Sequence, residues 1–168
     1  TPLYSSAASD VYKRQTEAWT QGHGPQILVL NAEPGRGKTH LAKSAYRALG
    51  DKFQLATWLH DNTIVDQIMA TFADHTTAAW LAQFDSMRWL FIDDFGVASK
   101  TPTIDSIMDR LIDKRIEAAD LGARTLITTN LSPHDLSPRT SSRLRDVRLV
   151  KSLTIDAPDF RSSPHSSS

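Results

Sequence analysis

Residues 32–40, with the sequence AEPGRGKTH, place two glycines, a lysine and a threonine directly after the apolar run QILVL. Gly35 and Gly37 let backbone N–H groups converge where a Cβ would crowd them. Lys38 adds a positive charge, and Thr39 adds a hydroxyl suited to Mg²⁺. A strand that turns through such a loop into a helix binds phosphate at the helix N-terminus. The pattern predicts a site for a nucleoside triphosphate, with Lys38 bridging its β- and γ-phosphates.

The whole loop is expected to contribute to this site, and we expect ATP with Mg²⁺ as its ligand. Ala32 departs from the strict pattern, because it stands where the first glycine would be. The alternative interpretation is a glycine-rich turn that only begins a helix. The residues predicted to contact the nucleotide are Glu33, Pro34, Gly35, Arg36, Gly37, Lys38, Thr39 and His40.

Two carboxylates follow a second apolar run in the sequence WLFIDDFG. Ligands of open parallel sheets bind at the carboxyl ends of the strands, which is where these acids would lie. Together with the phosphate loop, they predict that Asp93 and Thr39 hold Mg²⁺ and that Asp94 polarises the attacking water. The alternative is a pair of carboxylates that cap a loop. Because Asp94 is one methylene shorter than the glutamate found in many ATPases, we expect slow hydrolysis.

Two further polar sites follow along the chain. Asn130 ends the run LITTN and is predicted to contact the γ-phosphate and the attacking water, although asparagine after a strand also forms turns. In PRTSSRLRDVR, Arg143 is predicted to act as an arginine finger, inserted into the site of a neighbouring subunit. Arg139 is the second candidate for that role, and a solvated basic helix end is the alternative. A finger of this kind requires self-association.

Short apolar runs alternate with helical patterns, which predicts an α/β fold with a parallel sheet covered by helices. Strands are expected at residues 26–30, 55–59, 89–92, 125–129 and 149–155. Helices are expected at 38–49, at 104–119 and twice within 61–86. Asn62 or Thr63 could cap the first helix of that last pair. Its expected apolar face is Ile64, Val65, Ile68, Met69 and Phe72.

Length and composition set further limits. The 168 residues fit one domain, and 19 Lys plus Arg balance 19 Asp plus Glu, so any contact with nucleic acid must be local. The absence of cysteine excludes disulfides, thiol nucleophiles and cysteine-bound zinc. No apolar run reaches the roughly 18 residues of a membrane span, so we expect a cytoplasmic protein without a membrane partner. We expect a fragment with a non-native or disordered leader at 1–18, an ATP-binding domain at 19–161 and a disordered tail at 162–168.

Five motifs stand in order along the chain: GKTHLAKS, FIDDFG, LITTN, SRLRD and DFR. Over residues 27–161 the sequence resembles the DnaC and DnaI helicase loaders and the related IstB transposition helper ATPases, within the AAA+ class. The resemblance implies an AAA+ P-loop NTPase core, a five-stranded parallel sheet flanked by helices, without a complete lid domain. It also implies that Arg161 senses phosphate, and it implies a hexameric replicative helicase and single-stranded DNA as partners.

The same resemblance implies that residues 61–86 form the helical element that touches single-stranded DNA. The charge of this segment argues otherwise, because no Lys or Arg lies between Lys52 and Arg88 while four Asp do. We therefore expect DNA contacts elsewhere, at Arg110, Lys114, Arg115 or residues 139–151.

Three other functions remain open at this point. One is an IstB-like helper that binds duplex DNA and directs a transposase. Another is a P-loop small-molecule kinase, and the third is an inactive ATP-binding remnant. The ordered motifs together with the resemblance favour an ATPase that loads a helicase, and the sequence does not separate this function from that of the transposition helper.

Overall fold

A computed structural model describes residues 7–35, 37–98 and 101–155 of the chain. Its centre is a five-stranded parallel sheet in the order β2-β3-β4-β1-β5. All five predicted strands are confirmed, and every strand end lies within one residue of the expected one. Arg36, Arg161 and the expected tail at 162–168 lie outside the described residues. The strands are β1 (Ile27–Asn31), β2 (Ala56–His60), β3 (Trp89–Asp93), β4 (Arg124–Thr129) and β5 (Val150–Thr154).

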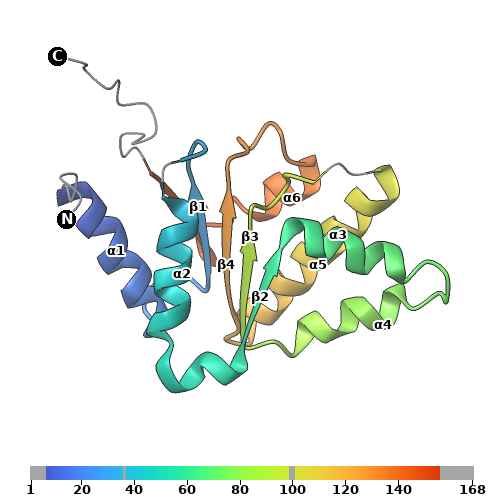
Figure 1. Ribbon diagram of the computed structural model, residues 1–168, viewed down its shortest axis with the longest axis horizontal. Helices are drawn as coiled ribbons and strands as arrows, with labels where there is room; N and C mark the ends of the chain where they lie inside the picture. Colours follow the sequence, from blue (N-terminus) through green and yellow to red (C-terminus); the bar gives the residue numbers. More distant parts are fainter. Residues whose placement is uncertain (1–6, 36, 99–100, 156–168) are drawn as a thin grey trace, which may run out of the picture.

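Helices cover both faces of the sheet (Figure 1). On one face lie α1 (Ala7–Thr20) and α2 (Lys38–Ala48), followed by the 3₁₀ turn η1 (Gly50–Leu55). On the other lie α3 (Asp61–Ala70), α4 (Thr77–Ala82), the 3₁₀ turn η2 (Gln83–Asp85), α5 (Pro102–Asp120) and α6 (Pro138–Arg143). Within the described ranges, no helix has the length and apolar character needed to cross a membrane.

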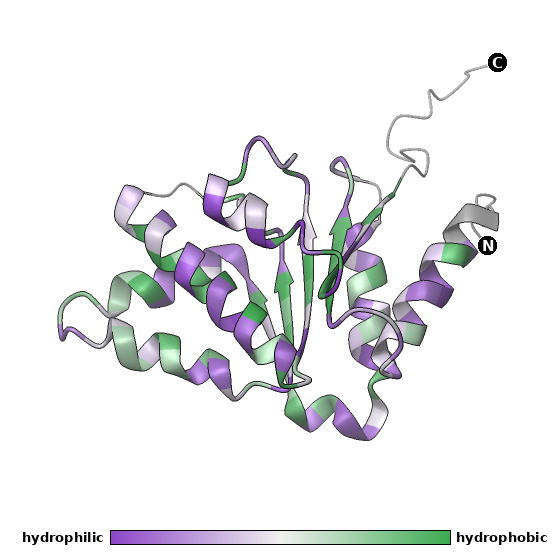
Figure 2. Ribbon diagram, turned by 180° about the vertical axis from the view of Figure 1, so that it is seen from behind, coloured by the Kyte–Doolittle hydropathy of each residue, from purple (hydrophilic) through white to green (hydrophobic). Residues whose placement is uncertain are grey.

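The inner strands β1, β3 and β4 are buried on both faces, because successive side chains point to opposite faces and helices cover both. In β1, Ile27 and Val29 belong to the core beneath α3 and α5, whereas Leu28 and Leu30 belong to the core beneath α1 and α2. Figure 2 shows the strands as apolar ribbons between helices with polar outer surfaces. This arrangement explains why β1 and β3 are apolar nearly throughout rather than alternating.

The segment 61–86 contains the two predicted helices, but the N-cap of the first one, α3, is not the residue expected. His60, rather than Asn62 or Thr63, caps α3: its ring Nδ1 accepts a hydrogen bond from the Asn62 N–H at 3.2 Å. The expected apolar face is buried at three of its five positions, Ile64, Val65 and Ile68. Met69, in the last turn of α3, and Phe72, beyond the end of the helix, are exposed.

Residues 7–18 of the segment predicted to be a non-native or disordered leader belong to helix α1. Helix α1 packs on α2 and on the edge of the sheet. The hydroxyl of Tyr12 donates to the Thr154 carbonyl at 2.9 Å, and the buried Trp19 donates its indole N–H to the Gln26 carbonyl at 3.2 Å. Trp19 also meets Trp89 edge-on at 5.4 Å between ring centroids.

Arg115 is part of the core and not a surface cation available to DNA. Only 1% of it is exposed, and its guanidinium donates to the Thr125 hydroxyl and to the carbonyls of Phe84, Met87 and Arg124 at 2.7–3.1 Å. Burial lowers the pKa of Arg115 to about 10, although the Asp85 carboxylate favours the charged form. The side chain stays protonated at neutral pH and joins α5 to β4 and to the turn before β3.

Replacing Arg115 with alanine should lower the free energy of unfolding by about 3–5 kcal/mol, because four buried acceptors lose their donor and a cavity is left. Urea denaturation followed by tryptophan fluorescence measures this change. Arg110→Ala, at an exposed position on the same helix, is the matched control and should change stability by less than about 0.5 kcal/mol. Equal stability of both variants would show that Arg115 does not hold these elements together.

Candidate active site

The loop between β1 and α2 presents uncapped backbone N–H groups. Gly35 and Gly37 have φ angles of 84° and 81°, in the left-handed region that favours glycine. Gly37 is the N-cap of α2 and contributes no side-chain hydrogen bond, so the first N–H groups of the helix are left for another acceptor. Ala32 is not among the described residues with positive φ, so an alanine fits where the strict motif has glycine. The loop is built to receive an anion.

A cavity of about 330 Å³ opens over this loop, and all six of its lining residues are glycine, basic or hydroxyl-bearing. They are Gly35, Gly37, Lys38, Thr39, His40 and Lys43. Lys38 is buried and begins α2, whereas Glu33 and Pro34 are exposed beside the cavity. A polyphosphate chain suits such a lining, because lysine charges, free N–H groups and the helix dipole all favour negative charge.

Asp93, at the end of β3, connects the loop to the neighbouring strand. Its Oδ1 accepts hydrogen bonds from the hydroxyls of Thr39, at 3.0 Å, and of Thr128, at 2.7 Å. Asp93 is buried, so these two hydroxyls replace water as its partners. Thr39 and Asp93 offer only oxygen donors, which are the ligands that Mg²⁺ prefers. The two residues predicted to hold the metal therefore lie together and have suitable chemistry.

Asp94 adopts an unusual conformation beside this pair. Its φ of 54° is in the left-handed region, where Asp is better tolerated than most residues. The Asp94 N–H donates to the Thr128 hydroxyl at 2.9 Å, which holds the backbone in this conformation. The carboxylate is 34% exposed, so it can reach a water molecule at the mouth of the site.

His60 lies against Asp94, which the sequence did not predict. His60 ends β2 opposite Asp93 in the strand register, and its Nε2 is 3.1 Å from Asp94 Oδ2. Since Nδ1 of the same ring accepts the Asn62 N–H, the neutral ring carries its hydrogen on Nε2 and donates it to Asp94. The ligand atoms of His60, Asp93 and Asp94 lie within 4.8 Å of one another.

Asp61 fixes the loop that follows the acidic pair. It is fully buried, and its two carboxylate oxygens accept from the N–H groups of Gly96, at 3.1 Å, and Ala98, at 2.9 Å. Its negative charge is therefore stabilised by backbone N–H groups inside the molecule. Of the four Asp counted as surface charge in residues 61–86, Asp61 is not at the surface, and Asp85 pairs with Lys114 at 3.1 Å.

Asn130 and Arg143 occupy different surroundings. Asn130 is exposed directly after β4, at the same edge of the sheet as Asp93. Arg143, on α6, donates to Asp113 of α5 at 3.1 Å, and Arg139 pairs with the same carboxylate. Within the described ranges, no hydrogen bond or ion pair joins either arginine to the phosphate loop or the acidic pair. The two arginines predicted as candidate fingers therefore both lie on α6 and share the Asp113 carboxylate as their partner.

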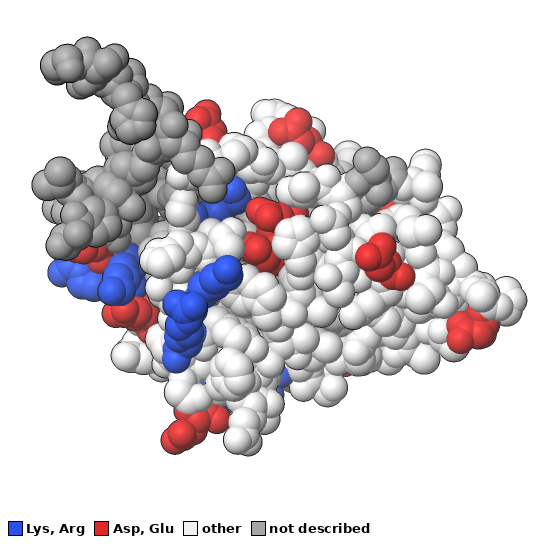
Figure 3. Space-filling model, viewed as in Figure 1, with Lys and Arg blue, Asp and Glu red and all other residues white. Residues whose placement is uncertain are grey.

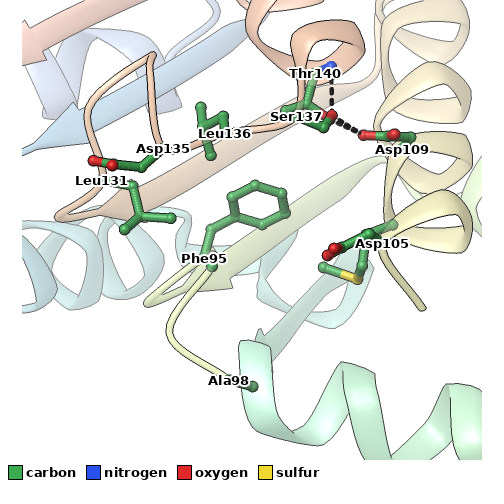
Figure 4. Close-up of a pocket in the computed structure, with 11 residues that line it drawn as sticks. Phe95, Ala98, Asp105, Asp109, Leu131, Asp135, Leu136, Ser137 and Thr140 are labelled. Atoms are coloured by element: carbon green, nitrogen blue, oxygen red, sulfur yellow. Dashed lines mark hydrogen bonds between the residues drawn. The ribbon is translucent and has the colours of Figure 1, made fainter. Parts of the chain in front are cut away.

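A second cavity, of about 350 Å³, lies beside the site between the loops after β3 and β4 and helices α5 and α6 (Figure 4). Figure 4 shows Asp109 bonded to Ser137 at one end of it, and Asp105 and Asp135 also line it. Three carboxylates would repel a phosphate chain. This cavity is therefore not the nucleotide site, although it is comparable in size to the cavity over the loop.

Thr128→Val should destabilise the protein by about 1–3 kcal/mol, because it removes the hydroxyl that bonds both Asp93 and the Asp94 N–H while keeping the side-chain shape. Thr154→Val, at an exposed position of edge strand β5, is the matched control and should change stability by less than about 0.5 kcal/mol. Thermal melting measures both. An equal Tm for the two variants would contradict the structural role of Thr128.

No protein-family model matches the chain, and no curated protein matches it either. Several solved structures, in contrast, are similar to this chain. A DnaC helicase loader is 18% identical and superposes with a TM-score of 0.72, covering 92% of this chain and 93% of that one. DnaI is 18% identical, with a TM-score of 0.71 over 92% and 88%.

A third similar structure is a replication initiator, DnaA, determined with AMPPCP and single-stranded DNA. It is 16% identical, with a TM-score of 0.70 over 94% of this chain and 48% of that one. Identities this low establish the fold alone. The chain therefore has the AAA+ fold of the P-loop NTPases, as found in DnaC, DnaI and the matching part of DnaA.

Proposed function

We propose that the protein binds and hydrolyses ATP as an AAA+ protein of DNA replication, and that it loads a replicative helicase onto single-stranded DNA. The observation that carries the ATPase part is the Asp93 carboxylate, bonded to Thr39 of the phosphate loop and to Thr128. It joins a phosphate-binding loop to a partly exposed acid, Asp94, which is the combination that hydrolysis of a bound triphosphate requires.

In this proposal residues 33–40 enclose the phosphates of ATP. Backbone N–H groups at Gly35 and Gly37 and the start of α2 bind the phosphate oxygens, and Lys38 reaches the β- and γ-phosphates. Thr39 and Asp93 would hold Mg²⁺, which when bound offsets the negative charge of the triphosphate. Arg161, which lies outside the described residues, keeps its proposed role as a second contact to phosphate.

Hydrolysis is assigned to residues at the carboxyl edge of the sheet. Asp94 accepts a proton from the attacking water, and His60 orients it through the hydrogen bond to Oδ2. Asn130 would orient the water and contact the γ-phosphate from the end of β4. Asp94 is short and also tied to His60, which supports the expectation of slow turnover.

Arg143 is proposed to act in a neighbouring subunit. Its side chain is 51% exposed, and its ion pair with Asp113 is accessible to solvent. Exposed pairs of this kind contribute about 0–1 kcal/mol, so the guanidinium can exchange Asp113 for a phosphate group at little cost. Self-association would then complete the site of each subunit with an arginine from the next one.

The replication part of the proposal is supported by similarity. DnaC is a helicase loader, and the similar DnaA structure holds AMPPCP together with single-stranded DNA. Both structures superpose on more than nine tenths of this chain. We therefore propose a hexameric replicative helicase and single-stranded DNA as its partners.

ATP turnover tests the site directly, measured alone, with single-stranded DNA and with the cognate helicase. Lys38→Ala should weaken ATP affinity about 100-fold, because a charge-assisted contact to phosphate is lost. Asp94→Asn should keep ATP affinity but lower kcat about 10²–10⁴-fold, because the proton acceptor is removed. Lys151→Ala, at an exposed position of β5, is the control.

Normal turnover by Lys38→Ala and Asp94→Asn would reject the site. Transfer of phosphate to a small acceptor, without any effect of DNA or helicase, would favour a kinase instead.

Mixing variants tests the arginine finger. Arg143→Ala should lower kcat about 10³-fold or more, because the neighbouring site loses its transition-state cation. Adding Asp94→Asn subunits should restore part of the activity, since these donate an intact Arg143 to sites that retain Asp94. Arg139→Ala provides the comparison. If Arg143→Ala is fully active, or if mixing restores nothing, Arg143 does not act between subunits.

A further inference from the structure

A groove bordered by aromatic rings lies on the α2 face of the sheet, at the edge strand β2. Its volume is about 360 Å³, and its lining comes from three consecutive elements: α2, η1 and β2. Figure 1 shows these elements next to one another. The lining residues are Lys43, Tyr46, Arg47, Phe53 and Trp58. None of them is needed for the ATPase chemistry described above, except that Lys43 also borders the phosphate cavity.

The rings form a preformed platform anchored in the core. Tyr46 meets Phe53 at 4.9 Å and Trp58 at 5.4 Å between ring centroids, both edge-on. Trp58 in turn stacks on the fully buried Phe91, at 5.6 Å with an interplanar angle of 15°. Phe53 is nevertheless 50% exposed. A flat ligand would find rings that are already fixed, so little conformational entropy is lost on binding.

The charge beside the platform is positive. Helix α2 carries Lys38, Lys43 and Arg47 and no acidic residue, in a chain whose total charge is zero. Lys38 is buried at the phosphate loop, whereas no ion pair in the described part of the chain involves Lys43 or Arg47. Figure 3 shows basic side chains over α2. One acid, Asp51, is nearby in sequence, in η1.

We propose that this groove binds single-stranded nucleic acid, with bases stacked on Phe53 and Tyr46 and phosphates paired with Lys43 and Arg47. Exposed rings beside unpaired cations are the combination that recognises single strands, because every base has a face to stack and every nucleotide carries a phosphate. The proposal specifies the DNA contact of the proposed function. It places that contact on α2 rather than in residues 61–86, on α5 or in residues 139–151.

The position of the groove also connects it to ATP. Lys43 borders both the phosphate cavity and the groove, and α2 is one continuous helix between them. Any shift of α2 when a triphosphate binds at its first turn would move Lys43, Tyr46 and Arg47 together. Because linkage is reciprocal, nucleic acid in the groove would then alter ATP affinity by the same factor.

The test is the affinity for a fluorescent oligothymidylate, measured by anisotropy over a range of salt concentrations. Phe53→Ala should weaken binding about 5- to 100-fold, as the loss of one stacking platform does, without changing the salt dependence. Arg47→Gln should weaken binding and reduce the slope of log affinity against log salt by about 0.7, as the loss of one phosphate contact on a single strand does. The two variants thus separate stacking from charge.

Matched controls lie on the opposite face of the sheet. Phe72→Ala removes another exposed ring, and Arg110→Gln removes another exposed cation, on α5. Both should bind the oligonucleotide like the parent. If Arg110→Gln weakens binding while Phe53→Ala and Arg47→Gln do not, the nucleic-acid surface is on α5 and the groove proposal is overturned.

ATP affinity, measured on the same variants, separates this proposal from the proposed function. Phe53→Ala should bind and hydrolyse ATP like the parent. A loss of ATP affinity in Phe53→Ala would assign the rings to the base of the nucleotide itself and reject the groove as a nucleic-acid site. Binding of an acidic aromatic peptide, but not of oligothymidylate, would reject it in favour of a protein partner while the ATPase assignment stands.

Discussion

One carboxylate oxygen holds the site together. Asp93 Oδ1 accepts hydroxyls from two other elements, Thr39 at the start of α2 and Thr128 at the end of β4. The three groups can meet only because β3 and β4 are parallel neighbours and β1 delivers its loop to the same edge of the sheet. Any change in strand order or direction would separate them. The positions of the phosphate loop, of Asp93 and of Asp94, which follows it, depend on this arrangement.

The sequence was a good guide wherever the physics is local or periodic. The inner strands β1 and β3 are apolar runs because each is buried on both faces. The phosphate loop is contiguous, so its two glycines and its Lys-Thr pair are readable in order. The contact of His60 with Asp94 depends on strand register, which no local pattern encodes. A usable signal was present, because His60 ends an apolar run, as Asp93 does.

The prediction that Arg115 contacts DNA is wrong for a related reason. Its charge suggests a surface position, but it lies three residues after Ile112 and four after Leu111, on the apolar stripe of α5. That spacing places it on the buried side of the helix, where its guanidinium finds three carbonyls and a hydroxyl. Asp61 is a similar case, a charged residue at the start of a helix whose partners are distant backbone groups. Net charge therefore said little about the surface of this molecule.

The two hydrogen bonds of His60 connect helix α3 to the Asp94 carboxylate through one imidazole ring. Its Nδ1 caps the first turn of α3, while its Nε2 bears on Asp94. A displacement of α3 would therefore move the ring and, with it, the Asp94 carboxylate. In the proposed function, a partner that binds α3 would in this way change the rate of ATP hydrolysis.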